Sequence, residues 1–152
     1  MEIVRANESD LREILELQYA AYQSEAVLLN NFDIPPLKQT YDEVLAEYGK
    51  GLFLKAVDGN GGIIGSVRAY IKDGTAYVGK LIVRPEMQDR GIGTELVRAV
   101  ERECPAARHE IFTSDKSLRT IKLYERLGYN RFREEKVSDG LTLVYLEKHS
   151  AG

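Results

Sequence analysis

Apolar and polar residues follow two periodic patterns along the chain, and these patterns predict its secondary structure. Alternating or continuous apolar runs predict strands at 2–6, 52–57, 63–71, 75–83, 111–113, 129–137 and 141–147. Apolar positions at helical spacing predict helices from residue 9 or 10 to about 26, from 40 to 48, over 92–103 and over 117–127. The predicted order is therefore β-α-α-β-β-β-α-β-α-β-β.

Capping and turn residues mark the boundaries of these elements. Ser9 or Asp10 can cap the first helix, and Thr40 can cap the second. Pro35-Pro36 interrupts the helical pattern between them and predicts a stiffened loop. Gly128 follows the last helix, where a glycine commonly ends one.

This order of elements predicts a mixed α/β fold. We expect a mixed, mostly antiparallel sheet of about seven strands with helices on both faces. Only the middle of the chain has the strand–helix rhythm of a parallel unit. The sequence has no visible linker, repeat or low-complexity tract, and 152 residues suit one domain, so residues 1–152 are expected to form a single domain.

Composition narrows the function classes. The net charge of −3 is too acidic for a general nucleic-acid binder. The N-terminus lacks the apolar run of a signal peptide, and no apolar stretch approaches the ~18 residues that cross a bilayer, so we expect a cytoplasmic protein with no membrane partner. The single cysteine, Cys104, excludes an internal disulfide and is expected to be a partly buried helix residue.

The most informative segment is the turn that joins strand 75–83 to helix 92–103 through Gly91 and Gly93. The first N–H groups of a helix lack internal partners, and glycines let an anion approach them closely. Thr94 and Glu95 follow Gly93, which excludes a phosphate loop of the Gly-Lys-Ser/Thr type. A dinucleotide-binding turn needs a third glycine, which this sequence lacks. Dinucleotide binding therefore stays open only as a weaker alternative.

Two correctly spaced motifs resemble those of the GNAT superfamily of N-acetyltransferases. Gln88-Asp89-Arg90-Gly91-Ile92-Gly93 resembles its Gln/Arg-x-x-Gly-x-Gly/Ala signature, and 117–129 resembles its second signature. The resemblance implies a GNAT-like fold that binds acetyl-CoA, with the pyrophosphate on the glycine turn and the pantetheine arm beside strand 75–83, which usually carries a β-bulge. The cofactor residues implied are Leu81, Ile82, Val83, Gln88, Asp89, Arg90, Gly91, Ile92, Gly93, Thr94 and Ser117, with Arg90, Lys116 and Lys122 as neighbours of the phosphates.

The same resemblance implies a general acid, Tyr124, which would protonate the departing thiolate. Many relatives carry Asn at the position of Ser117. Many also carry a glutamate, the general base, on the strand that corresponds to 75–83. Thr75–Arg84 contains no carboxylate, so the base is left open among Glu25, Tyr22, Asp115 and ordered water. His109 and His149 are expected on the surface, and no metal site is expected.

The acceptor is expected to be the amine of a small molecule or a peptide. The resemblance implies that the first helices, their loop and the last hairpin hold the acceptor. Aromatic and acidic residues suit an amine, and this region contains Tyr19, Tyr22, Glu25, Phe32, Asp33, Tyr41 and Tyr48. The function expected is direct transfer of an acetyl group to a primary amine in a ternary complex. A non-catalytic acyl-CoA-binding regulatory module is the alternative, supported by the absent strand glutamate. A free edge on the last hairpin would allow a homodimer.

Overall fold

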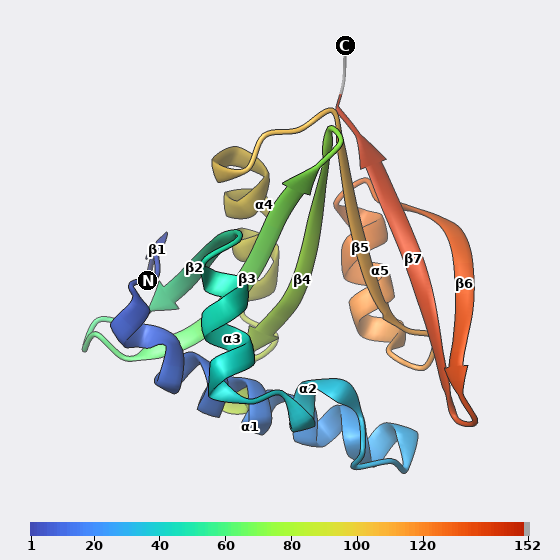
Figure 1. The fold of residues 1–152 in the computed structure, drawn as a ribbon, viewed down its shortest axis with the longest axis horizontal. Coiled ribbons are helices and arrows are strands. Elements are labelled where there is room, and N and C mark those ends of the chain that lie inside the picture. Colours follow the sequence, from blue (N-terminus) through green and yellow to red (C-terminus); the bar gives the residue numbers. More distant parts are fainter. Residues whose placement is uncertain (151–152) are drawn as a thin grey trace.

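A computed structural model describes residues 1–150, which contain one seven-stranded sheet (Figure 1). The strand order is β1-β2-β3-β4-β5-β7-β6, and every neighbouring pair is antiparallel except β4 and β5. The strands are β1 (Glu2–Arg5), β2 (Leu52–Val57), β3 (Ile63–Lys72), β4 (Thr75–Val83), β5 (Arg108–Ser114), β6 (Asn130–Ser138) and β7 (Leu141–His149). The predicted mixed, mostly antiparallel sheet is confirmed, and a parallel dinucleotide-binding sheet is excluded as the scaffold.

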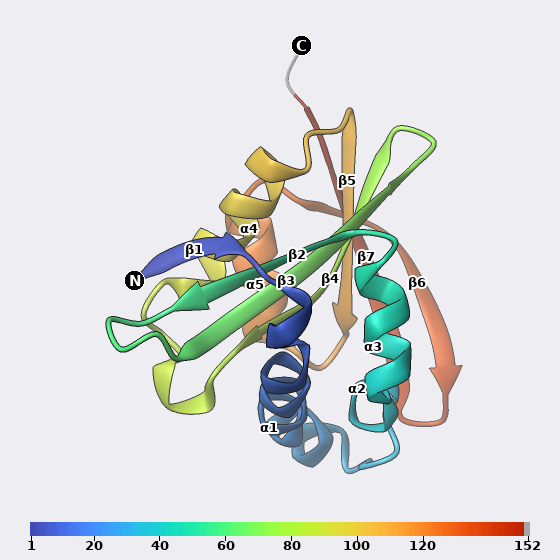
Figure 2. The same ribbon diagram turned by 60° about the vertical axis from the view of Figure 1, so that its left-hand side comes forward.

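Helices cover both faces of the sheet, as predicted (Figures 1 and 2). One face carries α1 (Leu11–Leu29), α2 (Pro35–Lys38) and α3 (Tyr41–Tyr48). The other face carries α4 (Ile92–Glu103) and α5 (Leu118–Arg126). Successive strand residues point to opposite faces, so Phe53 packs with α1 and α3 while Leu54 packs with α4. The sheet is therefore buried between two helical layers.

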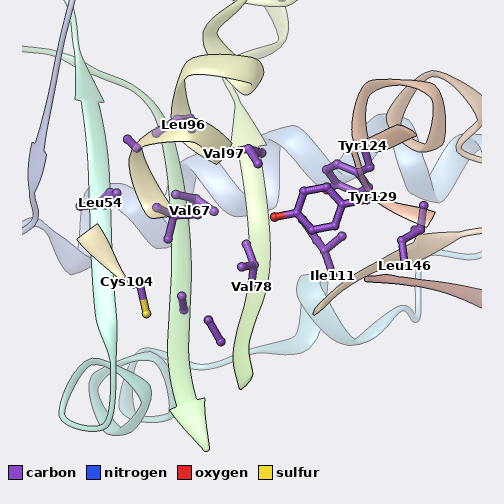
Figure 3. Close-up of a cluster of buried hydrophobic side chains, with 14 of the residues drawn as sticks. Leu54, Val67, Val78, Leu96, Val97, Cys104, Ile111, Tyr124, Tyr129 and Leu146 are labelled. Atoms are coloured by element: carbon purple, nitrogen blue, oxygen red, sulfur yellow. The ribbon is translucent and has the colours of Figure 1, made fainter. Parts of the chain in front are cut away.

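The larger core lies between the sheet and the helices α4 and α5 (Figure 3). Leu96 and Val97 of α4 are fully buried against strand residues such as Val67. Tyr124 of α5 joins the same cluster and has an exposed fraction of 3%. This packing fixes the positions of α4 and α5 relative to β4, and all three elements border the site described below.

The first helix differs from the prediction at both ends. The chain enters it through a short 3₁₀ turn, Glu8–Asp10, and the Asp10 carboxylate accepts a hydrogen bond from the Asn7 N–H at 2.7 Å. Asp10 occupies the N-cap position of α1 as predicted, but its side chain makes no capping hydrogen bond to this helix, and Ser9 lies within the 3₁₀ turn. The helix continues to Leu29, since Ala26 and Leu29 bury an apolar patch against Ile34 and Leu141.

Two further predictions on the helices have different outcomes. Thr40 caps α3 as predicted, with its hydroxyl accepting from the Glu43 N–H at 3.2 Å. Pro35-Pro36 does not form a loop, because it begins the one-turn helix α2, where proline tolerates the first positions.

The prediction of a surface His109 is wrong. Strand β5 begins at Arg108, earlier than predicted, because it pairs with both β4 and β7. His109 therefore lies inside the sheet with an exposed fraction of 6%, and its Nε2 lies 2.9 Å from the carbonyl oxygen of Cys104. Cys104 is itself buried just after α4, more deeply than predicted.

Strands β4 and β5 pair over only four residues. Thr75–Val78 pairs in parallel with Arg108–Ile111, and the strands then diverge. Just beyond this ladder, β4 carries a bulge opposite Ser66–Arg68 of β3, and the bulged residue Lys80 has a φ of 50°. The bulge predicted for this strand is confirmed.

Gly65 lets α4 approach the sheet closely. A Cβ atom there would lie 2.9 Å from a methyl carbon of Leu96 and 3.1 Å from the carbonyl oxygen of Ile82. We expect Gly65→Ala to lower the free energy of unfolding by about 1–3 kcal/mol, because the backbone and α4 must move apart. Urea unfolding measures the change.

Gly59→Ala is the matched control, because a Cβ atom at Gly59 would meet no atom within 4 Å. Its stability should stay within about 0.5 kcal/mol of the parent protein. Equal stability of the two variants would contradict the close packing inferred at Gly65.

Within residues 1–150, no helix is both long and apolar enough to cross a membrane. The same residues hold no group of three or more His, Cys, Asp or Glu side chains arranged to bind a metal ion.

Candidate functional site

A cleft of about 1060 Å³ opens where β4 and β5 diverge. Its walls come from the bulged part of β4, the turn before α4, the helix α5, the C-terminal half of α1 and the start of α2. All the cofactor residues predicted from the sequence line this cleft except Arg90. Residues far apart in the chain thus meet in one elongated site.

The turn before α4 builds the end of the cleft from backbone groups. Asp89 and Gly91 both adopt left-handed conformations, with φ values of 65° and 81°, and α4 begins at the next residue. The first N–H groups of α4 have no partner within the helix, and the residues that carry them line the cleft, where they can bind an anion. Gly93 adds close packing, because a Cβ atom there would lie 3.4 Å from a methyl carbon of Leu123.

Basic side chains surround this end of the cleft. Lys116 and Lys122 line it, as the resemblance implied, and Arg119 lines it as well. Arg119 forms an exposed ion pair with Asp89, which ties the start of α5 to the glycine turn. Sequence reasoning missed Arg119, although its position one turn before Lys122 on the predicted helix was a usable signal.

The edge of β4 contributes the middle of the cleft. Leu81, Ile82 and Val83 lie beyond the last residue pair between β4 and β5. Their backbone groups on the β5 side are therefore outside the ladder, at a place where the cleft is open. An extended amide-bearing chain can pair with such an edge as an added strand does.

Tyr124 lies on the α5 wall. Burial raises the pKa of its phenol far above the ordinary value. Electrostatic interactions with Tyr22 and with Glu25 raise this pKa further. The hydroxyl forms no hydrogen bond with any other side chain in the described part of the chain, although the residue borders the cleft. Tyr124 thus presents a firmly protonated O–H to whatever occupies the cleft.

Ser117 and Glu25 connect the two sides of the site. The Ser117 hydroxyl donates a hydrogen bond to Oε1 of Glu25, which comes from α1. Ser117 occupies the N-cap position of α5, but its side chain makes no capping hydrogen bond to this helix. The bond holds the Glu25 carboxylate beside α5 and close enough to Tyr124 to influence its phenol.

The other two candidate bases have different surroundings. Burial raises the pKa of Tyr22 to about 12, and the charge of Glu25 adds to this effect. Tyr22 is therefore protonated at neutral pH. Asp115 is exposed and does not line the cleft. Glu25 is thus the candidate carboxylate that the structure brings into the site.

Most of the aromatic residues expected at the acceptor end have structural partners instead. Tyr19 and Tyr48 donate their hydroxyls to the carbonyl oxygens of Gln39 and Ala6. Tyr41 lies under the Arg12 guanidinium. Phe32 and Asp33 are exposed beside α2 and do not line the cleft. Of the seven residues expected there, Tyr22 and Glu25 border the cleft.

Comparisons with known proteins agree with this geometry. The acetyltransferase (GNAT) family matches residues 10–129. UPF0157 protein YqkA of Bacillus subtilis (strain 168) is 25% identical over 133 residues, which are 87% of this chain. The chain spans only 38% of that relative's length.

Solved structures share the fold over nearly the full chain. The PaiA N-acetyltransferase of Thermoplasma acidophilum, solved with coenzyme A, has a TM-score of 0.80 and 17% identity, covering 98% of both chains. The ribosomal-protein-S18-alanine N-acetyltransferase of Escherichia coli has a TM-score of 0.81 and 17% identity, covering 99% of this chain and 96% of its own. With the family match extending over most of the sequence, the chain belongs to the acetyltransferase (GNAT) family.

Proposed function

We propose that this protein is an acetyl-CoA-dependent N-acetyltransferase that acts on a primary amine of a small molecule or a peptide. The observation that carries the proposal is the single cleft that contains the glycine turn, the open edge of β4 and the buried phenol of Tyr124. Membership of an acetyltransferase family supports the same conclusion.

The residues present fit acetyl-CoA. The N–H groups at the start of α4, with Lys116, Arg119 and Lys122 nearby, suit the phosphates. The β4 edge at 81–83 suits the two amides of the pantetheine arm. The cleft volume of about 1060 Å³ leaves room for an acceptor beside the thioester.

The chemistry needs an acid and a base. When bound, acetyl-CoA supplies an acetyl thioester, whose carbonyl carbon bonds to the amine nitrogen as its C–S bond breaks. Tyr124 is suited to donate its proton to the departing sulfur, because its raised pKa keeps the phenol protonated beforehand. Glu25 is suited to accept the proton that an ammonium must lose before it attacks. The nitrogen loses a second proton as the amide forms, and the Tyr124 phenolate is suited to take it, which restores the acid.

Transfer is proposed to be direct, within a ternary complex. An acyl-enzyme route needs a nucleophile such as a cysteine thiolate in the cleft. Cys104 is the only cysteine, it does not line the cleft, and burial raises the pKa of its thiol. It lies on the far side of the core from Tyr124 (Figure 3).

Thermal unfolding with acetyl-CoA, coenzyme A and NAD tests the cofactor. At about 100 times the dissociation constant, a ligand adds about 2.7 kcal/mol to stability. For a domain of this size the midpoint should rise by roughly 5–10 °C. We expect the rise with acetyl-CoA and coenzyme A but not with NAD. No rise with either would refute the cofactor assignment.

An acetylation assay over a panel of amines, read by release of free coenzyme A thiol, tests the transfer. We expect transfer to at least one primary amine. Binding of acetyl-CoA without transfer to any amine would favour the non-catalytic regulatory module instead.

A further inference from the structure

Lys80 is a cation in the cleft that neither the cofactor site nor the proton transfers use. It is the bulged residue of β4, its side chain is half-buried, and it borders the cleft. Within residues 1–150, no carboxylate lies within ion-pair distance of its ammonium group. A lysine that is partly desolvated and unpaired is unfavourable, and an anionic group of a ligand would stabilise it.

The surroundings of Lys80 do not neutralise it. Arg68 of β3 is nearly fully buried and forms an ion pair with Glu47 of α3 at 3.3 Å. Burial lowers the pKa of the Lys80 ammonium, the positive charge of Arg68 lowers it further, and the negative charge of Glu47 opposes both. Glu47 is thus paired with Arg68, and no carboxylate remains within ion-pair distance to balance the Lys80 ammonium in the described part of the chain.

Arg68 is also incompletely satisfied. Its guanidinium donates to Gln39 at 3.1 Å, to Gln18 and to Glu47, and it lies over the Phe53 ring. Its Nε is buried and has no hydrogen-bond partner among the described residues. Arg68 therefore retains an unused N–H donor, and the neighbouring Lys80 retains an unpaired ammonium.

The positions of Lys80 and Arg68 favour a role in binding the acceptor. Lys80 precedes the open edge 81–83, whereas the glycine turn follows that edge, so the two lie at opposite ends of the β4 segment that borders the cleft. Arg68 lies near Tyr22, and Tyr22 lies near Glu25 and Tyr124, as their mutual electrostatic influence shows. Lys80 is thus on the side of the proposed acid and base, away from the proposed phosphate site.

We propose that Lys80, supported by Arg68, binds an acidic group of the acceptor. The acceptor is then a small amine that also carries a carboxylate or a similar anion, with its amine beside Glu25 and its acid beside Lys80. A diamine or polyamine would place a second cation against Lys80. The inference rests on the proposed function, whose acceptor site it describes.

Matched acceptors test the charge requirement. Each ω-amino acid is compared with the alkylamine and the diamine of the same length, and each α-amino acid with its carboxamide. We expect kcat/KM to be roughly ten- to a hundredfold higher for the acidic member of at least one matched set, the range of a charge-assisted hydrogen bond.

Variants of Lys80 identify the residue responsible. Lys80→Gln should raise KM for acidic acceptors by roughly ten- to a hundredfold, with little change in kcat or in acetyl-CoA affinity. Lys80→Arg should restore most of the loss, because it keeps the charge. Lys122→Gln, at the opposite end of the cleft, should weaken acetyl-CoA and leave the preference for acidic amines intact.

Calorimetric titration of the coenzyme A complex with the same acceptors separates the two proposals. Binding of acidic amines that requires Lys80, without any acetyl transfer, would refute the proposed function and leave the Lys80 site standing. Equal kcat/KM for neutral, cationic and acidic amines would overturn the Lys80 inference alone. Loss of acetyl-CoA affinity in Lys80→Gln, or no binding of acidic amines, would also overturn it.

Discussion

Tyr124→Phe should lower kcat by roughly 10²–10⁴-fold, the range of a lost general acid. The phenyl ring retains the packing of Tyr124 in the core and removes only the O–H that faces the cleft. Without that proton, the sulfur must leave as a thiolate in a partly dry site, which is costly. The affinity for acetyl-CoA should change little. Steady-state kinetics and titration calorimetry measure the two quantities.

Tyr129→Phe is the matched control for this experiment. Tyr129 is a buried neighbour of Tyr124, with ring centroids 6.1 Å apart, but it does not line the cleft. Its hydroxyl donates to Glu101 at 2.8 Å, so its loss should reduce stability and leave kcat largely unchanged. A Tyr124→Phe enzyme with normal kcat would show that solvent or another group protonates the sulfur.

Glu25→Gln should also lower the rate by roughly 10²–10⁴-fold, as expected for a lost general base. The amide oxygen of Gln can still accept the hydrogen bond from Ser117, so the substitution removes basicity and retains the contact between α1 and α5. The loss should be largest for alkylamines, which are protonated at neutral pH. It should shrink for weakly basic amines such as arylamines, which are already unprotonated at neutral pH.

Ser117→Ala tests whether positioning of the Glu25 carboxylate contributes to the rate separately from its basicity. It removes the hydrogen bond that positions Glu25 but keeps the basic carboxylate itself, so we expect a smaller loss, on the order of tenfold. If Glu25→Gln reacted at the full rate with alkylamines, the proton would have to leave through water, and Glu25 would be a structural residue.

The fold was predictable because its elements have strong local signals. Alternation along β2 to β4, Thr40 at the start of α3 and the glycines before α4 each indicated the correct element. The failures were non-local. His109 looked exposed because the extension of β5 depends on pairing with β7, whose partner residues lie some forty positions later.

The end of the cleft that is proposed to bind the cofactor could be located from the sequence for the same reason. Its residues form one contiguous segment, from Leu81 to Thr94, with a recognisable motif. The proposed acceptor end combines cleft residues of α1 and β4 with the ion pair between Arg68 of β3 and Glu47 of α3, so no window of sequence contains it. Neither Lys80 nor Arg68 belongs to a recognisable motif, so the sequence pattern alone does not indicate a role for either residue.

The four-residue ladder between β4 and β5 divides the sheet into two halves, β1–β4 and β5–β7. Because so few hydrogen bonds join β4 to β5, this junction is a weak part of the sheet. The amides next to it should exchange their hydrogens faster than those in the β2–β3 pairing. A ligand lying in the cleft touches both halves at once. Its binding would therefore make the two halves unfold as one cooperative unit. Without ligand, the chain would open first between β4 and β5.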